Sequence, residues 1–129
     1  MRILFDSLKP IYIQIADAIE DDILSGKLCE GEPVYSQLVL SKELNVNPAT
    51  AAKGINILVQ KGILQKQRGL AMIIAVGARE TLLTEKQDNV FLPLAQSLVD
   101  EAKKIGLSEK DMIATIRRLA GEAVNTNST

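Results

Sequence analysis

The chain has 129 residues, of which 15 are basic and 16 acidic, with one cysteine and no histidine. This length suits one domain, or a small domain with an appendage. Without histidine, neither histidine metal sites nor histidine-based catalytic triads can be built, and the lone Cys29 excludes an internal disulfide. Most hydrolytic enzymes are therefore excluded, and no metal or other cofactor is expected.

The net charge of −1 hides an uneven distribution of charge along the chain. Residues 36–79 carry six basic side chains and one acidic one, a net charge of +5, whereas the segments before and after carry −4 and −2. A basic segment between acidic flanks favours a surface that faces a polyanion such as DNA. On charge alone, an ordinary solvated face would explain the segment equally well.

The sequence contains no sign of a membrane or export segment. Its longest apolar runs, such as Leu70–Val76, are far shorter than a spanning helix, and residues 1–10 lack the features of a signal peptide. A cytoplasmic protein without a membrane partner is expected.

A first helix is predicted between Pro10 and Gly26. Pro10 suits the first turn of a helix, and apolar residues including Tyr12, Ile15 and Ile19 recur at helical spacing. Acidic residues occupy the other face, so we expect this helix to support the fold rather than to contact DNA.

Two short helices joined by a tight turn are predicted next. Ser36 can cap the first, which should end near Leu44, and Asn45 tolerates the left-handed backbone of the turn. Asn47 is then a good N-cap and Pro48 a good first residue for the second helix. Ala51, Ile55 and Leu58 form the apolar stripe that this second helix would bury.

The second of these helices has the features of a DNA recognition helix. If it lies in a major groove, its first turns contact the DNA, which points to Asn47, Ala49, Thr50 and Lys53. Thr50 can bond a phosphate or a base edge, Ala49 can contact a thymine methyl, and Lys53 can contact a phosphate or guanine. Asn47 is more useful as the cap of its own helix. A generic alanine-rich helix is the alternative interpretation.

A small β-hairpin is predicted after Gly62. Residues 63–67 and 71–75 read as strands on either side of a tip formed by Arg68, Gly69 and Leu70. Such a wing suits a minor groove, because glycine allows close backbone approach and arginine enters narrow grooves. We therefore expect Lys66, Arg68 and Gly69 to contact DNA. An ordinary hairpin with a solvated arginine remains the alternative.

The rest of the chain is predicted to form helices with a different role. A capping-box pattern at residues 84–87 predicts a helix that ends at Gly106, with a kink or restart at Pro93. Ser108 and Asp111 start another helix, in which Met112, Ile113, Ile116 and Leu119 are expected to face inwards. Residues 121–129 are predicted to be a loose tail.

Two short helices cannot form a core alone, so their apolar stripes must pack on another surface. A second copy of the chain fits best, because a two-fold pair would match a pseudo-palindromic operator. Packing within one chain is the alternative, and the appendage is too small to enclose an ordinary ligand pocket. The residues expected to form the dimer interface are Phe91, Leu94, Leu98, Ala102, Ile105, Met112 and Ile116.

Several segments resemble the winged-helix domain of GntR-type bacterial transcription regulators. They are residues 10–15, 25–28, 44–50, 58–64 and 68–69. The Asn-Pro-x-Thr start of the recognition helix and the short C-terminal part are similar to the YtrA-like subfamily, which typically has a two-helix dimerisation appendage. The resemblance implies a homodimeric repressor, with control of neighbouring transporter genes, and it puts Ser36 and Gln37 at the DNA.

The sequence departs from the family pattern at positions that would contact DNA. Leu38 and Ala52 stand where the family usually has arginine, and the wing reads Gly69-Leu-Ala-Met-Ile73 instead of Gly-Arg-Gly-Thr-Phe. Three polar contacts per half-site are thus absent, each worth about 1–3 kcal/mol. These changes favour the alternative of a winged helix that binds proteins and has lost specific DNA binding.

Together these patterns predict a mainly α-helical fold with a small β-hairpin. A winged helix-turn-helix would span residues 1–77, and a helical dimerisation appendage residues 78–120. The predicted protein is a non-enzymatic, homodimeric DNA-binding repressor, because cations and polar groups cluster in one segment. Neither the operator nor an effector can be identified from these residues.

Overall fold

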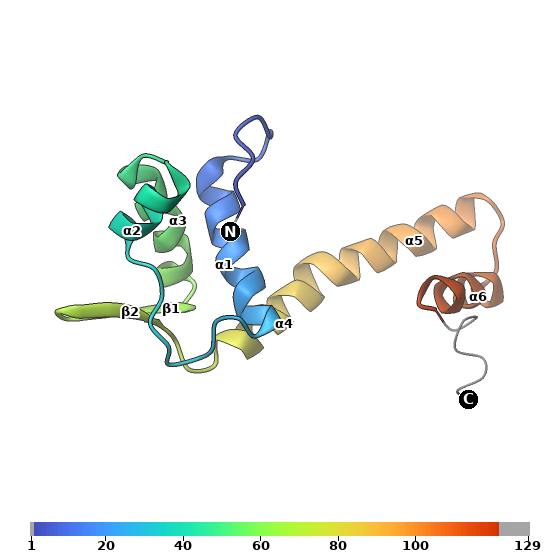
Figure 1. Ribbon diagram of the computed structural model, residues 1–129. Helices are drawn as coiled ribbons and strands as arrows, with labels where there is room; N and C mark the ends of the chain where they lie inside the picture. Colours follow the sequence, from blue (N-terminus) through green and yellow to red (C-terminus); the bar gives the residue numbers. More distant parts are fainter. Residues whose placement is uncertain (1, 122–129) are drawn as a thin grey trace. The chain divides into compact units, whose positions relative to one another are not determined.

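The computed structural model describes residues 2–121 (Figure 1). The chain forms two compact units, an N-terminal unit that ends at Glu85 and a C-terminal unit that begins at Lys86. The division lies later than the predicted one after Gly77, because Ala78 and Leu82 are buried in the core of the N-terminal unit. Of the predicted tail, residues 122–129 lie outside the described residues.

The N-terminal unit contains the three predicted helices. Helix α1 spans Ile11–Ser25 and ends at Gly26, whose φ of 87° is the left-handed conformation that suits glycine. Helix α2 spans Gln37–Leu44, and its first turn is capped by the hydroxyl of Ser36, which accepts the Val39 N–H at 3.1 Å. The turn residue Asn45 has φ 55°, as its residue type predicts.

Helix α3 spans Pro48–Gln60 and begins as the sequence predicts. The Asn47 side chain accepts the Ala49 N–H at 2.8 Å, and Pro48 occupies the first turn. The helix buries one face against α1 and α2. The buried core residues of the two longer helices are Ile15, Ala16, Ile19 and Ile23 of α1 and Ala51, Ile55 and Leu58 of α3.

The predicted wing is an antiparallel hairpin of strands β1 (Leu64–Gln67) and β2 (Leu70–Ile74). Leu64 pairs with Ile74 near its base, and the register shifts between Gln65 and Gln67. The segment before α2 lies along the other edge of β2, since Val34 N–H donates to the Met72 carbonyl at 2.8 Å. This hydrogen bond links the hairpin to the segment that leads into α2, and the hairpin extends outwards from the helices (Figure 1).

Helix α4 (Ala78–Lys86) begins earlier than predicted, and Thr84 lies inside it rather than at its start. The prediction of a capping box at Thr84 is therefore wrong. The N-terminus of α4 is instead capped from a distant segment, because the Glu30 carboxylate accepts the Gly77 N–H at 2.7 Å and the Arg79 N–H at 3.3 Å. A carboxylate at a helix N-terminus is favourable wherever in the sequence it comes from.

The helical backbone changes type just before Pro93. A π-helical turn, η1 (Gln87–Phe91), precedes α5 (Leu92–Lys104), and Pro93 occupies the first turn of α5. Within η1 the Leu92 N–H bonds to the Gln87 carbonyl, five residues back. Helix α5 begins at Leu92 with Pro93 in its first turn, which is the restart that the sequence predicts, and the wider turn before it is the local irregularity that a proline requires.

Helix α6 spans Glu109–Leu119 and has the predicted capping box. The Ser108 hydroxyl accepts the Asp111 N–H at 3.1 Å, and the Asp111 carboxylate accepts the Ser108 N–H at 2.9 Å. None of the α6 side chains expected to face inwards is buried, and Ile113, Ile116 and Leu119 are exposed. No helix among the described residues is long and apolar enough to cross a membrane.

Candidate nucleic-acid interface

The outward face of α3 carries four side chains at helical spacing. Ala49, Lys53, Asn56 and Gln60 are exposed, and they lie on the face of α3 that is turned away from the buried residues Ala51, Ile55 and Leu58. Sequence reasoning identified Ala49 and Lys53 but missed Asn56. Asn56 follows Lys53 by three residues, and this spacing places the two side chains on the same face of a helix.

A groove of about 310 Å³ lies beside this face, between α3, the start of α2 and the hairpin. Its polar lining comes from Gln37, Lys53, Asn56 and Lys66. Together with Ala49, which also lines the groove, the structure therefore brings together four of the predicted DNA contacts, from three different elements. Amide and ammonium groups in one groove can bond phosphate oxygens or base edges.

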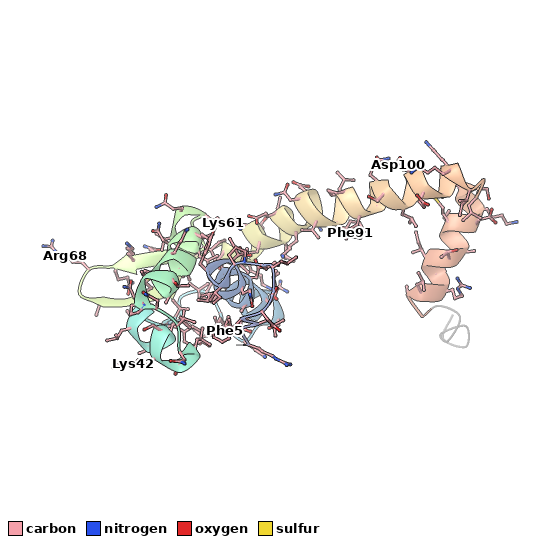
Figure 2. The ribbon with its side chains drawn as sticks, turned by 90° about the horizontal axis from the view of Figure 1, so that it is seen from above. Phe5, Lys42, Lys61, Arg68, Phe91 and Asp100 are labelled. Carbon is pink, nitrogen blue, oxygen red and sulfur yellow. The ribbon has the colours of Figure 1, made fainter. Side chains whose placement is uncertain are left out.

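The wing tip carries the predicted arginine. Gly69 has φ 71°, a conformation that favours glycine, so the turn at the tip depends on this residue. Figure 2 shows Arg68 at the end of the hairpin, with its side chain directed away from the helices. The guanidinium can therefore reach a ligand that lies beyond the tip.

Two of the predicted polar contacts serve as helix caps. Asn47 uses its side-chain oxygen to cap α3, as its residue type predicts, and Ser36 uses its hydroxyl oxygen to cap α2. The Ser36 hydroxyl can still donate its proton to a phosphate. Thr50 is half-buried in the first turn of α3, so only part of its side chain is accessible.

The cations of residues 36–79 fall into two groups. In the part of the chain that the structure describes, four of the six have no acidic side chain within ion-pair distance, namely Lys42, Lys53, Lys66 and Arg68. Lys61 instead pairs with two carboxylates, and the Arg79 guanidinium donates to the Leu24 carbonyl at 3.3 Å. The net charge of this segment therefore overstates the positive charge available to DNA.

Lys53 has a partner that sequence reasoning did not identify. Its ammonium nitrogen lies 4.1 Å from the centroid of the Tyr12 ring, within the range of a cation–π interaction. Tyr12 belongs to α1, which was expected to play only a supporting role. No pattern in the sequence connects these two residues, because they are brought together by the packing of α1 on α3.

The residues that depart from the family pattern are at least partly accessible to solvent. Leu38 on α2 is 56% exposed, and Leu70 beside the wing tip is 72% exposed. Met72 and Ala52 are half-buried, and both line the groove beside α3. The interface thus combines cations with apolar side chains. Among residues 2–121 no group of three or more acidic or cysteine side chains could hold a metal ion.

The predicted dimerisation residues lie in the C-terminal unit, and most of them are exposed. Phe91 is 69% exposed, and Leu94, Leu98, Ile105 and Ile116 are also exposed. Met112 is half-buried. Ala102 differs from the others, because it is buried within one chain, with only 4% of its surface exposed. Its carbonyl accepts the Leu107 N–H at 2.9 Å.

Comparison with known proteins identifies the family. The family described as "Bacterial regulatory proteins, gntR family" matches residues 11–74, the segment from α1 to the end of the wing. The HTH-type transcriptional regulator YhcF of Bacillus subtilis is 29% identical over 113 residues, which cover 88% of this chain and 92% of that protein.

Solved structures agree with this assignment. YtrA from Sulfolobus acidocaldarius, a GntR-family transcription factor, is 28% identical with a TM-score of 0.59, covering 95% of this chain and 97% of that one. A GntR family transcriptional regulator from Listeria monocytogenes is 25% identical with a TM-score of 0.68, covering 88% and 98%. The chain therefore belongs to the GntR family of bacterial regulatory proteins, and it is a winged-helix DNA-binding transcriptional regulator rather than an enzyme.

Proposed function

We propose that this protein represses transcription as a homodimer that binds a pseudo-palindromic operator. In each half-site, α3 enters the major groove and the hairpin contacts the adjacent minor groove or its phosphates. The observation that carries this proposal is a set of cations without acidic partners: Lys53 and Lys66 line the groove beside α3, and Arg68 lies at the wing tip (Figure 2). Cations without acidic partners can neutralise phosphates at no cost in lost ion pairs.

We assign the DNA contacts to the side chains on this side of the N-terminal unit. Lys53, Lys66 and Arg68 bind phosphates, and Thr50 and Asn56 are placed to bond base edges or phosphates. Asn47 acts mainly through the helix that it caps. The complete set of proposed DNA contacts is Ser36, Gln37, Asn47, Ala49, Thr50, Lys53, Asn56, Lys66, Arg68 and Gly69.

We assign dimerisation to the C-terminal unit. Its apolar side chains on η1, α5 and α6 are exposed within one chain, and a partner surface would remove them from water. If two copies pair through the same self-complementary face, the apolar side chains of both copies are buried at once. The proposed interface residues are Phe91, Leu94, Leu98, Ile105, Met112 and Ile116, and Ala102 contributes mainly to packing within its own chain.

Relatives support the choice of DNA as the partner. AraR(DBD), which is 25% identical with a TM-score of 0.54 over 58% of this chain and 96% of that one, is described in complex with operator ORX1. The exposed Leu38 and Leu70 favour a second candidate, a protein-interaction winged helix. The cations beside the recognition helix favour DNA over that candidate.

The test is a fluorescence-anisotropy titration of the full chain against the intergenic DNA upstream of its own gene and against a shuffled sequence. We expect tight binding to the native DNA only, which weakens steeply between low and moderate salt. Equal and weak binding to both DNAs at both salt concentrations would refute specific recognition and favour the protein-interaction candidate.

A pair of variants tests whether α3 reads the sequence. Thr50→Ala should weaken binding to the native DNA roughly fivefold or more, since one specific contact is worth about 1–3 kcal/mol. Thr81→Ala, an exposed change in α4 away from the groove, is the matched control and should leave binding unchanged. Equal effects of the two variants would show that Thr50 does not contact the operator.

A further inference from the structure

The pair of Tyr12 and Lys53 joins the supporting helix to the recognition helix. The Lys53 ammonium lies over the Tyr12 ring at 4.1 Å from its centroid, and Lys53 also lines the groove between α3 and the wing. Tyr12 is half-buried, whereas Lys53 is exposed. One residue of α1 thus contacts a side chain that is placed to reach DNA.

Beneath this pair, α1 and α3 pack closely at the backbone of Tyr12. A Cβ atom on Gly54, the neighbour of Lys53, would lie 2.8 Å from the Tyr12 carbonyl oxygen and 3.0 Å from Cγ2 of Ile15. The backbones of α1 and α3 therefore meet directly at Tyr12. Because Ile15 is fully buried on the same side, the backbone that carries the ring is held by helix packing rather than by a loop.

An aromatic partner has a different effect on a lysine from an acidic one. A carboxylate neutralises the ammonium, as Glu20 and Glu85 do at Lys61, whereas a ring attracts the cation through its quadrupole and leaves its charge intact. Among the described residues no acidic side chain pairs with Lys53. Lys53 therefore has an aromatic neighbour and no carboxylate beside it.

We propose that Tyr12 is a positioning residue of the DNA interface, whose ring holds the Lys53 ammonium where it binds a phosphate. This inference rests on the proposed function. A lysine side chain has many rotamers. If DNA has to fix the side chain in one of them, the lost conformational entropy weakens binding. The ring restricts those rotamers before DNA arrives, and it lets the ammonium reach a phosphate while it stays over the ring.

The first test is a double-mutant cycle measured by anisotropy with the native intergenic DNA. Tyr12→Leu removes the ring but keeps an apolar side chain, and it should weaken binding about two- to fivefold in the wild-type background. The same change should have no effect in a Lys53→Ala background, because its target is gone. Tyr12→Phe keeps the ring and should bind as the wild type does.

Two results of this cycle would overturn the proposal. If Tyr12→Leu weakens binding equally with and without Lys53, the residue acts through the fold alone. If Tyr12→Leu binds as tightly as the wild type or more tightly, the ring does not help Lys53 to reach DNA. Thermal unfolding of each variant, with Tyr12→Phe as the conservative reference, shows whether the fold is retained.

The second test needs no DNA, so it separates this inference from the proposed function. In NMR spectra, the ring current of Tyr12 should shift the ε-methylene protons of Lys53 upfield. The shift should persist in Tyr12→Phe and disappear in Tyr12→Leu. An unshifted Lys53 in the wild type would refute the pair itself, whereas a shifted Lys53 in a protein that binds no DNA would refute the proposed function and with it the role of the pair.

Discussion

The ammonium of Lys61 lies 2.9 Å from Oε2 of Glu20, whose side chain is only 4% exposed. The same ammonium donates to Oε1 of Glu85 at 2.7 Å. Lys61, which directly follows α3, therefore joins α1 and α4 through one cation. A carboxylate as buried as Glu20 needs such a partner, because an isolated buried charge is costly.

Removal of this cation should destabilise the N-terminal unit. We expect Lys61→Met to lower the free energy of unfolding by about 2–4 kcal/mol, somewhat less than for a fully buried pair because Lys61 is partly exposed to water. Urea unfolding monitored by circular dichroism would measure this. Lys9→Met, which breaks the exposed pair with Asp17, is the control and should cost at most about 1 kcal/mol. Equal losses in the two variants would contradict a special role for Glu20.

The same cation should make stability sensitive to alkaline pH. Burial acts to lower the pKa of Lys61, but hydrogen bonds to Glu85 and Glu20 and attraction by both carboxylates outweigh it, so the pKa is raised above 10.5. The pair therefore stabilises the fold fully below pH 10.5, and this contribution is lost as pH rises through the folded-state pKa. The difference in stability between the wild type and Lys61→Met should shrink over that range.

The close approach of α1 and α3 predicts that Gly54 cannot be enlarged. Gly54→Ala should destabilise the fold by about 1–3 kcal/mol, because the added Cβ would press on the Tyr12 carbonyl and on Ile15. Alanine is the better helix former by about 1 kcal/mol, so helix propensity alone predicts the opposite sign. Comparison of Asn56→Gly with Asn56→Ala, at an exposed position of the same helix, measures that propensity term. A more stable Gly54→Ala protein would contradict the close contact.

The wing cations should determine part of the salt dependence of DNA binding. The plot of log binding constant against log salt concentration should lose about 0.9 from its slope for each phosphate contact removed, as in Lys66→Ala and Arg68→Ala. Lys110→Ala, an exposed change on α6, should leave the slope unchanged. Unaltered slopes in both wing variants would place the hairpin away from DNA.

The exposed stripe of the C-terminal unit predicts where the proposed dimer can be disrupted. Leu98→Glu should convert the dimer into a monomer, since it places a charge in an apolar interface. Sedimentation velocity measures the change directly. Ser97→Glu, at the neighbouring exposed position, is the control and should remain dimeric. A Leu98→Glu protein that still sediments as a dimer would move the interface to another surface.

The elements that the sequence predicts well are those specified by local chemistry. The left-handed Asn45 and the cap formed by Asn47 before Pro48 each depend on residues close in sequence, and all of them are found as expected. The strands β1 and β2 differ by only one residue at their ends from the predicted spans. Periodic apolar residues between such local signals predict helices reliably.

The features that the sequence does not predict depend on residues that are distant in sequence. The start of α4 was missed because its cap is Glu30, which no local pattern connects to Gly77. The count of cations in residues 36–79 overestimates the charge that faces DNA. Lys61 binds Glu20 and Arg79 binds the Leu24 carbonyl, so both stabilise the fold instead. Tyr12 was assigned only to packing because its contact with Lys53 arises from the crossing of two helices.

The burial of Ala78 and Leu82 has a practical consequence for work with shortened chains. Both side chains are almost completely inaccessible in the core of the N-terminal unit, although the family match ends at residue 74. A fragment cut directly after the wing would lack these two side chains and would leave Lys61 without Glu85. An isolated DNA-binding fragment for crystallisation or NMR should therefore extend through Glu85, so that it carries the whole of its own core.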